Sequence, residues 1–341
     1  MVDKRSELLF CYDVTDANPN GDPMDENKPR IDEETGINIV TDVRLKRTVR
    51  DYLYNYRGFN GTAGKDILVR EIPAGDFIQD AKMRAEDFLK DDNQEKIDKR
   101  AMQNIFEMRE IIERNVKTQC IDLRLFGVTL PIELNTKSKN KKESSSDDDS
   151  KSSSSKNSSI TYTGPVQFKM GRSLHQVEPK HIKGTGAFAT KKEKQQKGFR
   201  EEHVLHYSFI AFHGIVNETA AAHTGLTDED VKELLSALWK GTQNLISRSK
   251  FGQMPRLLLK VTYKEKGFFI GDLDKKIKVT NCKNDNPLKI RGLKDFVLDV
   301  TELLAALEKY AAKIESIEYV MDENLRLSGK LPETFKSLTL L

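Results

Sequence analysis

The chain has 341 residues, of which 37% are hydrophobic and 32% charged, so it has enough apolar material for one large domain or two ordinary ones. The three cysteines, Cys11, Cys120 and Cys282, are scattered and show neither a disulfide framework nor zinc-ligand spacing. The sequence does not open on a signal peptide, and no apolar run approaches the roughly 20 residues of a membrane span. We therefore expect a soluble, cytoplasmic protein without a membrane partner.

The net charge of +3 conceals an uneven distribution. Residues 161–200 contain nine basic and two acidic side chains, and residues 240–264 contain six basic side chains and no acidic one. From residue 295 onward, nine acidic side chains face five basic ones. Local patches of this kind, more than net charge, are what a phosphate backbone meets.

The first 56 residues predict a strand, a loop and a helix. The short apolar run from Glu7 to Val14 is typical of a strand buried on both faces. The sequence Asn-Pro-Asn-Gly-Asp-Pro that starts at Asn18 is turn chemistry. Thr41 is a good helix N-cap, and Val40 and Leu45 occupy the positions of a hydrophobic staple around it.

This helix carries two kinds of side chain. Its buried stripe is predicted to be Leu45, Val49, Tyr52, Leu53 and Tyr56. Basic residues lie on the remaining sides, namely Arg44, Lys46, Arg47, Arg50 and Arg57. They indicate either a surface for a polyanion or an ordinary solvated face.

The next hundred residues predict strands, helix and a loop. Asp66 to Ile72 reads as a strand, and Ala81 to Val116 as helix with Ile105, Met108, Ile112 and Val116 inward. Gln119 to Phe126 alternates like a strand, which would place Asp122 and Arg124 on its outer face. Residues 136–159 contain no apolar side chain, so we expect a mobile loop between two strands.

The second half repeats the pattern. Residues 160–171 predict a strand, residues 179–200 an exposed basic hairpin or arm, and residues 203–216 a long strand. Thr227 and Asp230 predict a capped helix, followed by a strand at 257–263, a helix at 300–314 and a strand at 317–321. Strand–helix–strand therefore occurs twice, which predicts an α+β fold of the ferredoxin-like or RNA-recognition-motif type.

Several strings resemble one family. The opening strings are Tyr12-Asp13-Val14, Asn18-Pro19-Asn20-Gly21-Asp22-Pro23, Pro29-Arg30-Ile31-Asp32 and Val40-Thr41-Asp42-Val43-Arg44-Leu45-Lys46-Arg47. The later ones are Leu123-Arg124-Leu125-Phe126-Gly127, Thr163-Gly164-Pro165-Val166-Gln167, Gly225-Leu226-Thr227 and Ser247-Arg248-Ser249-Lys250-Phe251-Gly252-Gln253. Together they resemble the CRISPR-associated Cas-seven family, the repeated backbone subunit of type I Cascade complexes, and are most similar to its type I-B branch.

The resemblance implies a hand-shaped protein. The palm would comprise about 5–57, 203–264 and 296–322, the fingers about 58–163 including the loop 136–159, and the thumb about 177–202. Copies would polymerise along a CRISPR RNA and present its bases to complementary target DNA. The implied partners are CRISPR RNA, the target DNA strand, further copies of the chain and other Cascade subunits.

The basic patterns and the resemblance together select candidate RNA-binding residues. These are Arg44, Lys46, Arg47, Arg50, Lys169, Arg172, Lys183, Phe188, Lys191, Lys192, Ser247, Arg248, Ser249 and Lys250. Lys and Arg would neutralise phosphates, and Phe188, or Met170 beside its strand end, would stack on bases or pack in the core. We expect no catalytic residue, no cofactor and no metal ligand.

Two enzymatic alternatives stay open. Asp13, Asp16, Asp22 and Asp25 lie in and before the first loop, and backbone subunits of type III complexes use a loop aspartate for metal-dependent RNA cleavage. A nucleotide-binding enzyme would instead use the Gly184-Thr185-Gly186 segment, although no helix start follows it. His203 and His206 would point to opposite faces of a strand and so do not predict a metal site.

Overall fold

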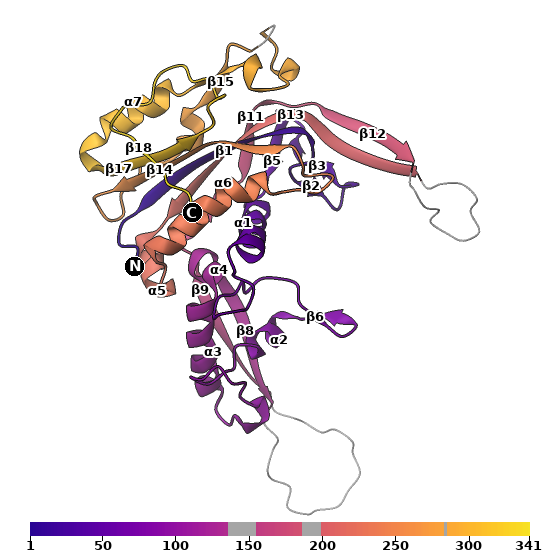
Figure 1. Ribbon diagram of the computed structural model, residues 1–341, viewed down its shortest axis with the longest axis vertical. Coiled ribbons are helices and arrows are strands. Elements are labelled where there is room, and N and C mark those ends of the chain that lie inside the picture. The colour runs from indigo at the N-terminus through magenta and orange to yellow at the C-terminus, as the bar shows by residue number, and fades with distance from the viewer. Residues whose placement is uncertain (136–154, 186–198, 283–284) are drawn as a thin grey trace, which may run out of the picture. The chain divides into compact units, whose positions relative to one another are not determined.

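The computed structural model describes residues 1–135, 155–185, 199–282 and 285–341 (Figure 1). The chain forms two compact units. The larger unit comprises Val2–Leu53, Val166–Thr219 and Thr227–Leu341, and the smaller one comprises Tyr54–Pro165 and Ala220–Leu226 together with Met1. Both contain helices and strands, which confirms the α+β class. Within the described ranges, every helix is too short or too polar to cross a bilayer.

The larger unit is mainly β-structure. Its strands are β1 (Ser6–Ala17), β2 (Gly21–Asp22), β3 (Lys28–Pro29), β4 (Ile31–Asp32), β5 (Ile37–Val40), β10 (Val166–Phe168), β11 (Gly171–Gln176), β12 (Pro179–Thr185), β13 (Phe199–Val216), β14 (Gln253–Tyr263), β15 (Lys278–Thr280), β16 (Val297–Asp299), β17 (Ile314–Met321) and β18 (Lys336–Ser337). Its helices are α1 (Asp42–Tyr56), α6 (Asp228–Gln243), α7 (Thr301–Lys309) and the short 3₁₀ turns η2 (Leu273–Lys276), η4 (Pro287–Lys289), η5 (Leu293–Asp295) and η6 (Ala311–Lys313).

A ten-stranded sheet is the frame of this unit. Its order is β18-β17-β14-β1-β13-β11-β5-β4, and β10 and β12 pair with other parts of β13. Strand β1 lies in the middle and is antiparallel to both neighbours, with Ser6 opposite Val216 of β13 and Thr262 of β14. The predicted strands at 7–14, 203–216 and 257–263 are therefore confirmed, each longer than predicted.

Both faces of the central strands are covered. On one face, Leu9 and Phe209 belong to a core cluster with Leu273, Phe296 and Leu303 from the C-terminal third of the chain. Helices α1 and α6 pack against each other, and Figure 1 shows α6 running along the sheet beside α1. Gly241 of α6 makes this approach possible, because a Cβ there would lie 3.1 Å from the Cβ of Tyr52.

The two capped helices begin as predicted. The hydroxyl of Thr41 accepts a hydrogen bond from the Arg44 backbone N–H (3.2 Å), and Thr227 forms a complete capping box with Asp230. The predicted stripe of α1 is buried except at its end. Tyr56 is 57% exposed, so its burial was wrongly predicted, because it is the last helical residue.

The smaller unit packs helices on a hairpin. It contains β6 (Pro73–Ala74), β7 (Phe77–Ile78), α2 (Ala81–Glu86), η1 (Lys99–Ala101), α3 (Ile105–Gln119), α4 (Ile121–Phe126), β8 (Gly127–Asn135) and β9 (Ser155–Thr163), and most of α5 (Glu218–Thr224). Strands β8 and β9 are antiparallel. The predicted inner face of α3, from Ile105 to Val116, packs with Leu130 and Ile160 of this hairpin.

Two strand predictions in this unit are wrong. Residues 119–126 end α3 and form α4, where Ile121, Asp122, Leu123, Leu125 and Phe126 are all buried. A segment buried at all positions but Arg124 has no informative period, so its alternation of apolar residues was misleading. Arg124 donates to the α3 carbonyls of Lys117 (2.9 Å) and Thr118 (3.0 Å).

The second wrong strand, residues 66–72, makes a single bridge, from Asp66 to Cys120. Its backbone is held by a side chain instead. The Asp122 carboxylate accepts hydrogen bonds from the N–H groups of Leu68 (2.7 Å) and Val69 (3.0 Å).

Three further segments differ in part. The helical region 81–116 is interrupted between α2 and α3. Of the predicted loop 136–159, residues 155–159 belong to β9, and the rest lies outside the described residues. The strand expected at 160–171 is divided among β9, β10 and the first residue of β11.

The hairpin at 179–200 is confirmed by the pairing of β12 with β13, although residues 186–198 lie outside the described ranges.

The buried carboxylate of Asp122 provides the first test. Asp122→Asn places an amide N–H₂ against one of two backbone donors and should lower the free energy of unfolding of the smaller unit by about 2 kcal/mol. The matched control, Asp76→Asn, removes the same charge from an exposed turn and should change it by less than about 0.5 kcal/mol. Urea denaturation followed by circular dichroism measures both. Equal stability of the two variants would contradict this role of Asp122.

Candidate nucleic-acid interface

The loop after β1 is fixed by backbone and amide hydrogen bonds. Asn18 donates through its backbone N–H to the carbonyl of Ser249 (2.8 Å) and through its side chain to those of Asn27 (2.7 Å) and His203 (3.2 Å). The Asn20 side-chain oxygen accepts from both the N–H and the hydroxyl of Thr41, each at 2.8 Å. The loop thus joins the start of α1 to the turn that follows α6.

That turn needs a glycine. The Thr15 N–H donates to the carbonyl of Gly252 (3.0 Å), and Gly252 has a φ of +109°. A Cβ there would lie 2.5 Å from the Thr15 carbonyl oxygen. Only glycine therefore lets residues 247–252 lie close against the end of β1.

Two cations meet at this junction. The Lys250 ammonium donates to the carbonyl of Asn18 (2.5 Å), and the Arg44 guanidinium donates to the hydroxyl of Thr48 (3.1 Å). Both side chains are half-buried. The Arg44 Nε atom is buried without a hydrogen-bond partner, and in the described part of the chain neither cation forms an ion pair with a carboxylate at contact distance.

The electrostatics at Arg44 and Lys250 are unfavourable for the free protein. Burial, reinforced by the positive charge of Arg44, lowers the pKa of Lys250 to about 8. Burial also lowers the pKa of Arg44 below its usual value, against the opposing charges of Asp51 and Tyr12. Two neighbouring, partly desolvated cations favour an anion between or beside them.

The other predicted cations that can be described mostly face carboxylates. Pairs form between Lys46 and Asp42 (3.0 Å), Arg47 and Asp51 (2.6 Å), Lys169 and Asp272, Arg172 and Asp32 (3.8 Å), Lys183 and Glu201 (3.7 Å), and Arg248 and Glu202. Arg50 is half-buried, and Ser247 and Ser249 contribute backbone carbonyls to the turn. Phe188, Lys191 and Lys192 lie outside the described residues.

Two of these residues, Lys46 and Lys169, are not simply solvated surface side chains. The Lys46 side chain is only 14% exposed and also donates to the side-chain oxygen of Gln167 (3.3 Å). Lys169 belongs to a separate cluster with Asp272 and Asp274. The structure therefore brings together Arg44, Lys250 and the 247–252 turn, and sets Lys169 apart.

A groove of about 590 Å³ lies beside the loop. Its lining includes Arg30, Thr41, Met170, His181 and His203. The imidazoles of His181 and His203 stack with ring centroids 4.5 Å apart, and Met170 is 54% exposed, so it is not a core residue. Sequence reasoning missed the histidine pair, since only the register of β12 on β13 places these residues opposite each other.

The four candidate aspartates have structural partners, and two of them form contacts with lysines: Asp25 pairs with Lys28 (2.6 Å) and Asp16 lies 3.7 Å from Lys180. One Asp22 oxygen accepts from the Met24 N–H (3.0 Å) and the other pairs with Arg30 (2.8 Å), which stabilises the turn. Asp13 is buried within β1, where it accepts from the Tyr207 hydroxyl (2.9 Å) and pairs with Arg256 (2.9 Å).

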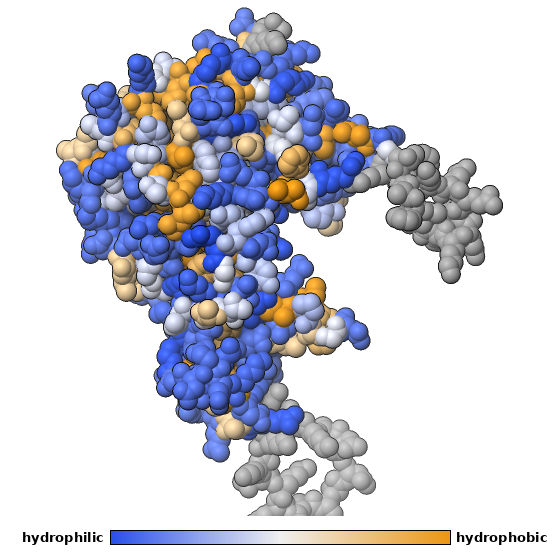
Figure 2. Space-filling view, in the orientation of Figure 1, coloured by the Kyte–Doolittle hydropathy of each residue, from blue (hydrophilic) through white to orange (hydrophobic). Residues whose placement is uncertain are grey.

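The smaller unit presents a different surface. Figure 2 shows hydrophobic residues gathered over the hairpin of β6 and β7, where Phe77 and Ile78 are both exposed. These two residues belong to none of the predicted site positions.

Comparison with known proteins gives the family. The model of the family "CRISPR-associated protein Cas7" matches residues 4–301, which includes the loop, α1 and the 247–252 turn. The chain belongs to this family. The resemblance seen in the sequence strings is thereby confirmed.

Two relatives show how far the likeness extends. A CRISPR-associated protein Cas7 of Haloferax volcanii is 34% identical over 342 residues, covering 95% of this chain and 88% of the relative. A solved chain from a "CRISPR RNA-guided surveillance complex, pre-nicking" matches with a TM-score of 0.51 at 13% identity, covering 98% of this chain and 95% of that one. The second likeness shows a shared fold.

The pKa of Lys250 leads to a pH-dependent prediction. Lys250 is mostly charged below pH 8 and mostly neutral above it, so affinity for a phosphate polymer should fall by up to about tenfold between pH 7 and 9. Lys250→Arg keeps its charge across this range and should flatten the dependence. Fluorescence anisotropy with an oligoadenylate, whose bases do not titrate in this range, measures the affinity. A pH dependence that is the same in both proteins would exclude Lys250 from the contact.

Proposed function

We propose that this chain is the CRISPR RNA-binding backbone subunit of a type I-B Cascade surveillance complex. Its copies line up along the guide spacer, contact one another and the other Cascade subunits, and present the guide bases to complementary target DNA. Membership of the Cas7 family supports this role.

The proposal rests on one observation: two positively charged side chains, Arg44 and Lys250, lie close to each other. A guide RNA carries a different spacer for each target, so its backbone subunit must bind phosphates and not base edges. Two partly buried cations at 247–252 and the start of α1, without a carboxylate partner among the described residues, fit one or two backbone phosphates. The backbone carbonyls of Ser247 and Ser249 accept hydrogen bonds from backbone N–H groups of the protein, which fixes the turn that carries Lys250.

The fold supports the proposed division of the chain into palm, thumb and fingers. Strands β14-β1-β13-β11 have the order of a ferredoxin-like or RNA-recognition-motif sheet, with α1 after β1 and α6 before β14, and form the proposed palm. The hairpin of β12 and β13 is the proposed thumb, and the smaller unit is the proposed finger region. The stacked His181 and His203 lie where the proposed thumb leaves the palm, and offer an aromatic surface to a base.

We also propose that the chain is a structural subunit and not a nuclease. A loop aspartate that activates water or holds a metal ion needs an available carboxylate oxygen. Both oxygens of Asp22 are engaged in stabilising their own turn, and Asp13 is buried in an ion pair. The type III-like RNase alternative is therefore the less favoured one.

Salt dependence tests the RNA-binding role. Single-stranded RNAs of unrelated sequence should bind with similar affinity, and log Kd should rise steeply with log salt. Arg44→Gln should weaken all of them and reduce the salt slope by about 1, since one phosphate contact is lost. Lys232→Gln is the control, because Lys232 is exposed on α6 and pairs with the equally exposed Glu229. A flat salt dependence, or equal effects of the two substitutions, would refute the proposed contact.

Cleavage tests the alternative. RNA bound by the wild-type protein should remain intact after prolonged incubation with magnesium or manganese, as measured on denaturing gels with end-labelled RNA. Asp22→Ala should leave this result unchanged and lower the stability of the loop, because it removes the Arg30 ion pair. Metal-dependent cleavage that Asp22→Ala abolishes while RNA binding persists would establish the nuclease.

A further inference from the structure

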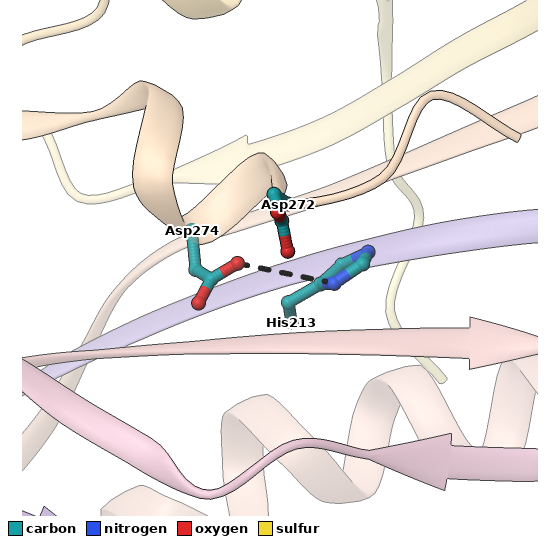
Figure 3. A group of neighbouring side chains, drawn as sticks. All are labelled: His213, Asp272 and Asp274. Atoms are coloured by element: carbon teal, nitrogen blue, oxygen red, sulfur yellow. Dashed lines mark ion pairs between the residues drawn. The ribbon is translucent and has the colours of Figure 1, made fainter.

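A cluster of three metal-binding side chains lies on the larger unit, apart from the Arg44–Lys250 pair. His213 comes from β13, and Asp272 and Asp274 come from the segment that enters η2 (Figure 3). One ligand atom from each of the three lies within 4.8 Å of the others. His213 precedes Asp272 by 59 positions and Asp274 by 61, so no spacing in the sequence indicates the cluster.

The histidine faces this cluster with an unsatisfied nitrogen. The His213 side chain is 6% exposed, and its Nδ1 atom is buried without a hydrogen-bond partner in the described part of the chain. The Oδ1 atom of Asp274 is likewise buried and lacks a hydrogen bond. The two atoms face each other at 3.8 Å, which is too long for a hydrogen bond (Figure 3).

The other ring nitrogen is firmly held. His213 Nε2 lies 2.7 Å from Glu7, a carboxylate that is fully buried and also accepts from the N–H groups of Ile270 and Gly271 and from the Tyr263 hydroxyl. The Glu7 carboxylate already accepts from three other donors and has no proton to give, so Nε2 carries the proton toward Glu7. In the neutral imidazole, the lone pair then lies on Nδ1 and points at Asp274.

This is the arrangement that orients a histidine for a metal ion. A ligating histidine generally donates its second N–H to a carboxylate, which fixes the ring and raises the basicity of the free nitrogen. Metal–nitrogen and metal–oxygen bonds of about 2.1 Å allow ligand atoms up to about 4.2 Å apart. The separation of 3.8 Å between His213 and Asp274 lies within that limit, and the half-exposed Asp272 has a carboxylate oxygen within 4.8 Å of both ligand atoms.

We propose that His213, Asp274 and Asp272 bind one divalent transition-metal ion, with Glu7 as the positioning residue of the histidine. One imidazole and two carboxylates suit zinc or manganese. The ion would tie β13 to the N-terminal end of η2, so its role is to stabilise this part of the larger unit.

Lys169 competes for this position. Its ammonium contacts Asp272 and lies 3.6 Å from Asp274, which makes it the counter-ion of the two carboxylates in the metal-free chain. Its side chain is 45% exposed, so it can leave toward solvent when a metal ion enters. The competition gives the site a signature that a surface acidic cluster lacks, since removal of a lysine should tighten metal binding.

The test is calorimetric titration of the full-length, tag-free protein with Zn²⁺, repeated with Mn²⁺ monitored by electron paramagnetic resonance. We expect one ion per chain for at least one metal. Asp274→Asn should weaken its binding by about tenfold or more, as loss of a ligand does. Lys169→Met should tighten it by about threefold or more, because a positive charge close to the ion is removed.

Controls separate the site from other causes. Asp76→Asn, an exposed acid of the smaller unit, should leave metal affinity unchanged. Circular dichroism of each variant without metal establishes that it is folded, and Asp272→Asn, at a half-exposed position, provides a second ligand change should Asp274→Asn fail to fold. Equal metal affinity of the wild-type protein and the folded ligand variants would overturn the proposal. Absence of one-to-one binding of either metal, even by Lys169→Met, would do so as well, and would leave the cluster as an ion-pair network of lysine, histidine and aspartates.

Discussion

The fold depends on the pairing of β1 with two strands that follow it by about 200 residues or more. Ser6 lies opposite Val216 on one side and Thr262 on the other, and nearly the whole strand is buried. Such pairings close very long loops and contribute only when both partners are in place. Every other strand of the sheet is added outside this central group of three.

Strand β1 also places polar side chains on both faces of the sheet. Successive side chains point to opposite faces, so Tyr12 lies near Arg44 whereas Asp13 pairs with Arg256. Glu7 shares a face with Leu9 and holds His213, and the carbonyl of Asn18, just beyond the end of the strand, receives Lys250. A slip of one residue in the register would exchange these faces and remove both polar clusters at once.

Sequence reasoning worked where local chemistry decides the structure. The helix that begins after Thr41 and the one that begins after Thr227 have caps written in four consecutive residues, and an apolar stripe supports each of them. The long strands at 203–216 and 257–263 contain stretches of apolar residues that are too long to be turns. These features need no knowledge of distant parts of the chain.

Sequence reasoning failed where the backbone N–H groups of a segment bond to a distant side chain and not to a neighbouring strand. The segment 66–69 looks like a strand, but its N–H groups bond to the Asp122 carboxylate. For the candidate interface, the sequence selected Arg44 and Lys250 among fourteen residues without ranking them. Their difference from Arg47 or Arg172 lies in partners, since the ion pairs of those residues follow from packing that no local pattern encodes.

Whether a cation has a carboxylate partner has an energetic consequence for the proposed RNA contacts. Exposed pairs such as Arg47 with Asp51, or Lys183 with Glu201, are worth about 0–1 kcal/mol, so exchanging a carboxylate for a phosphate changes little at those positions. Among the residues that the structure describes, Arg44 and Lys250 have no carboxylate partner to give up. Their partial desolvation is a cost that the free protein carries permanently, and a phosphate that binds there offsets a cost already present.

The sequence around these cations makes that arrangement persistent. A flexible lysine would turn to solvent and escape desolvation, but Lys250 is held by the carbonyl of Asn18, and its turn is held against β1 through Gly252. Arg44 is fixed by Thr48, one turn further along α1. The free protein therefore holds two partly desolvated cations in place, as a binding site for the proposed phosphate would require.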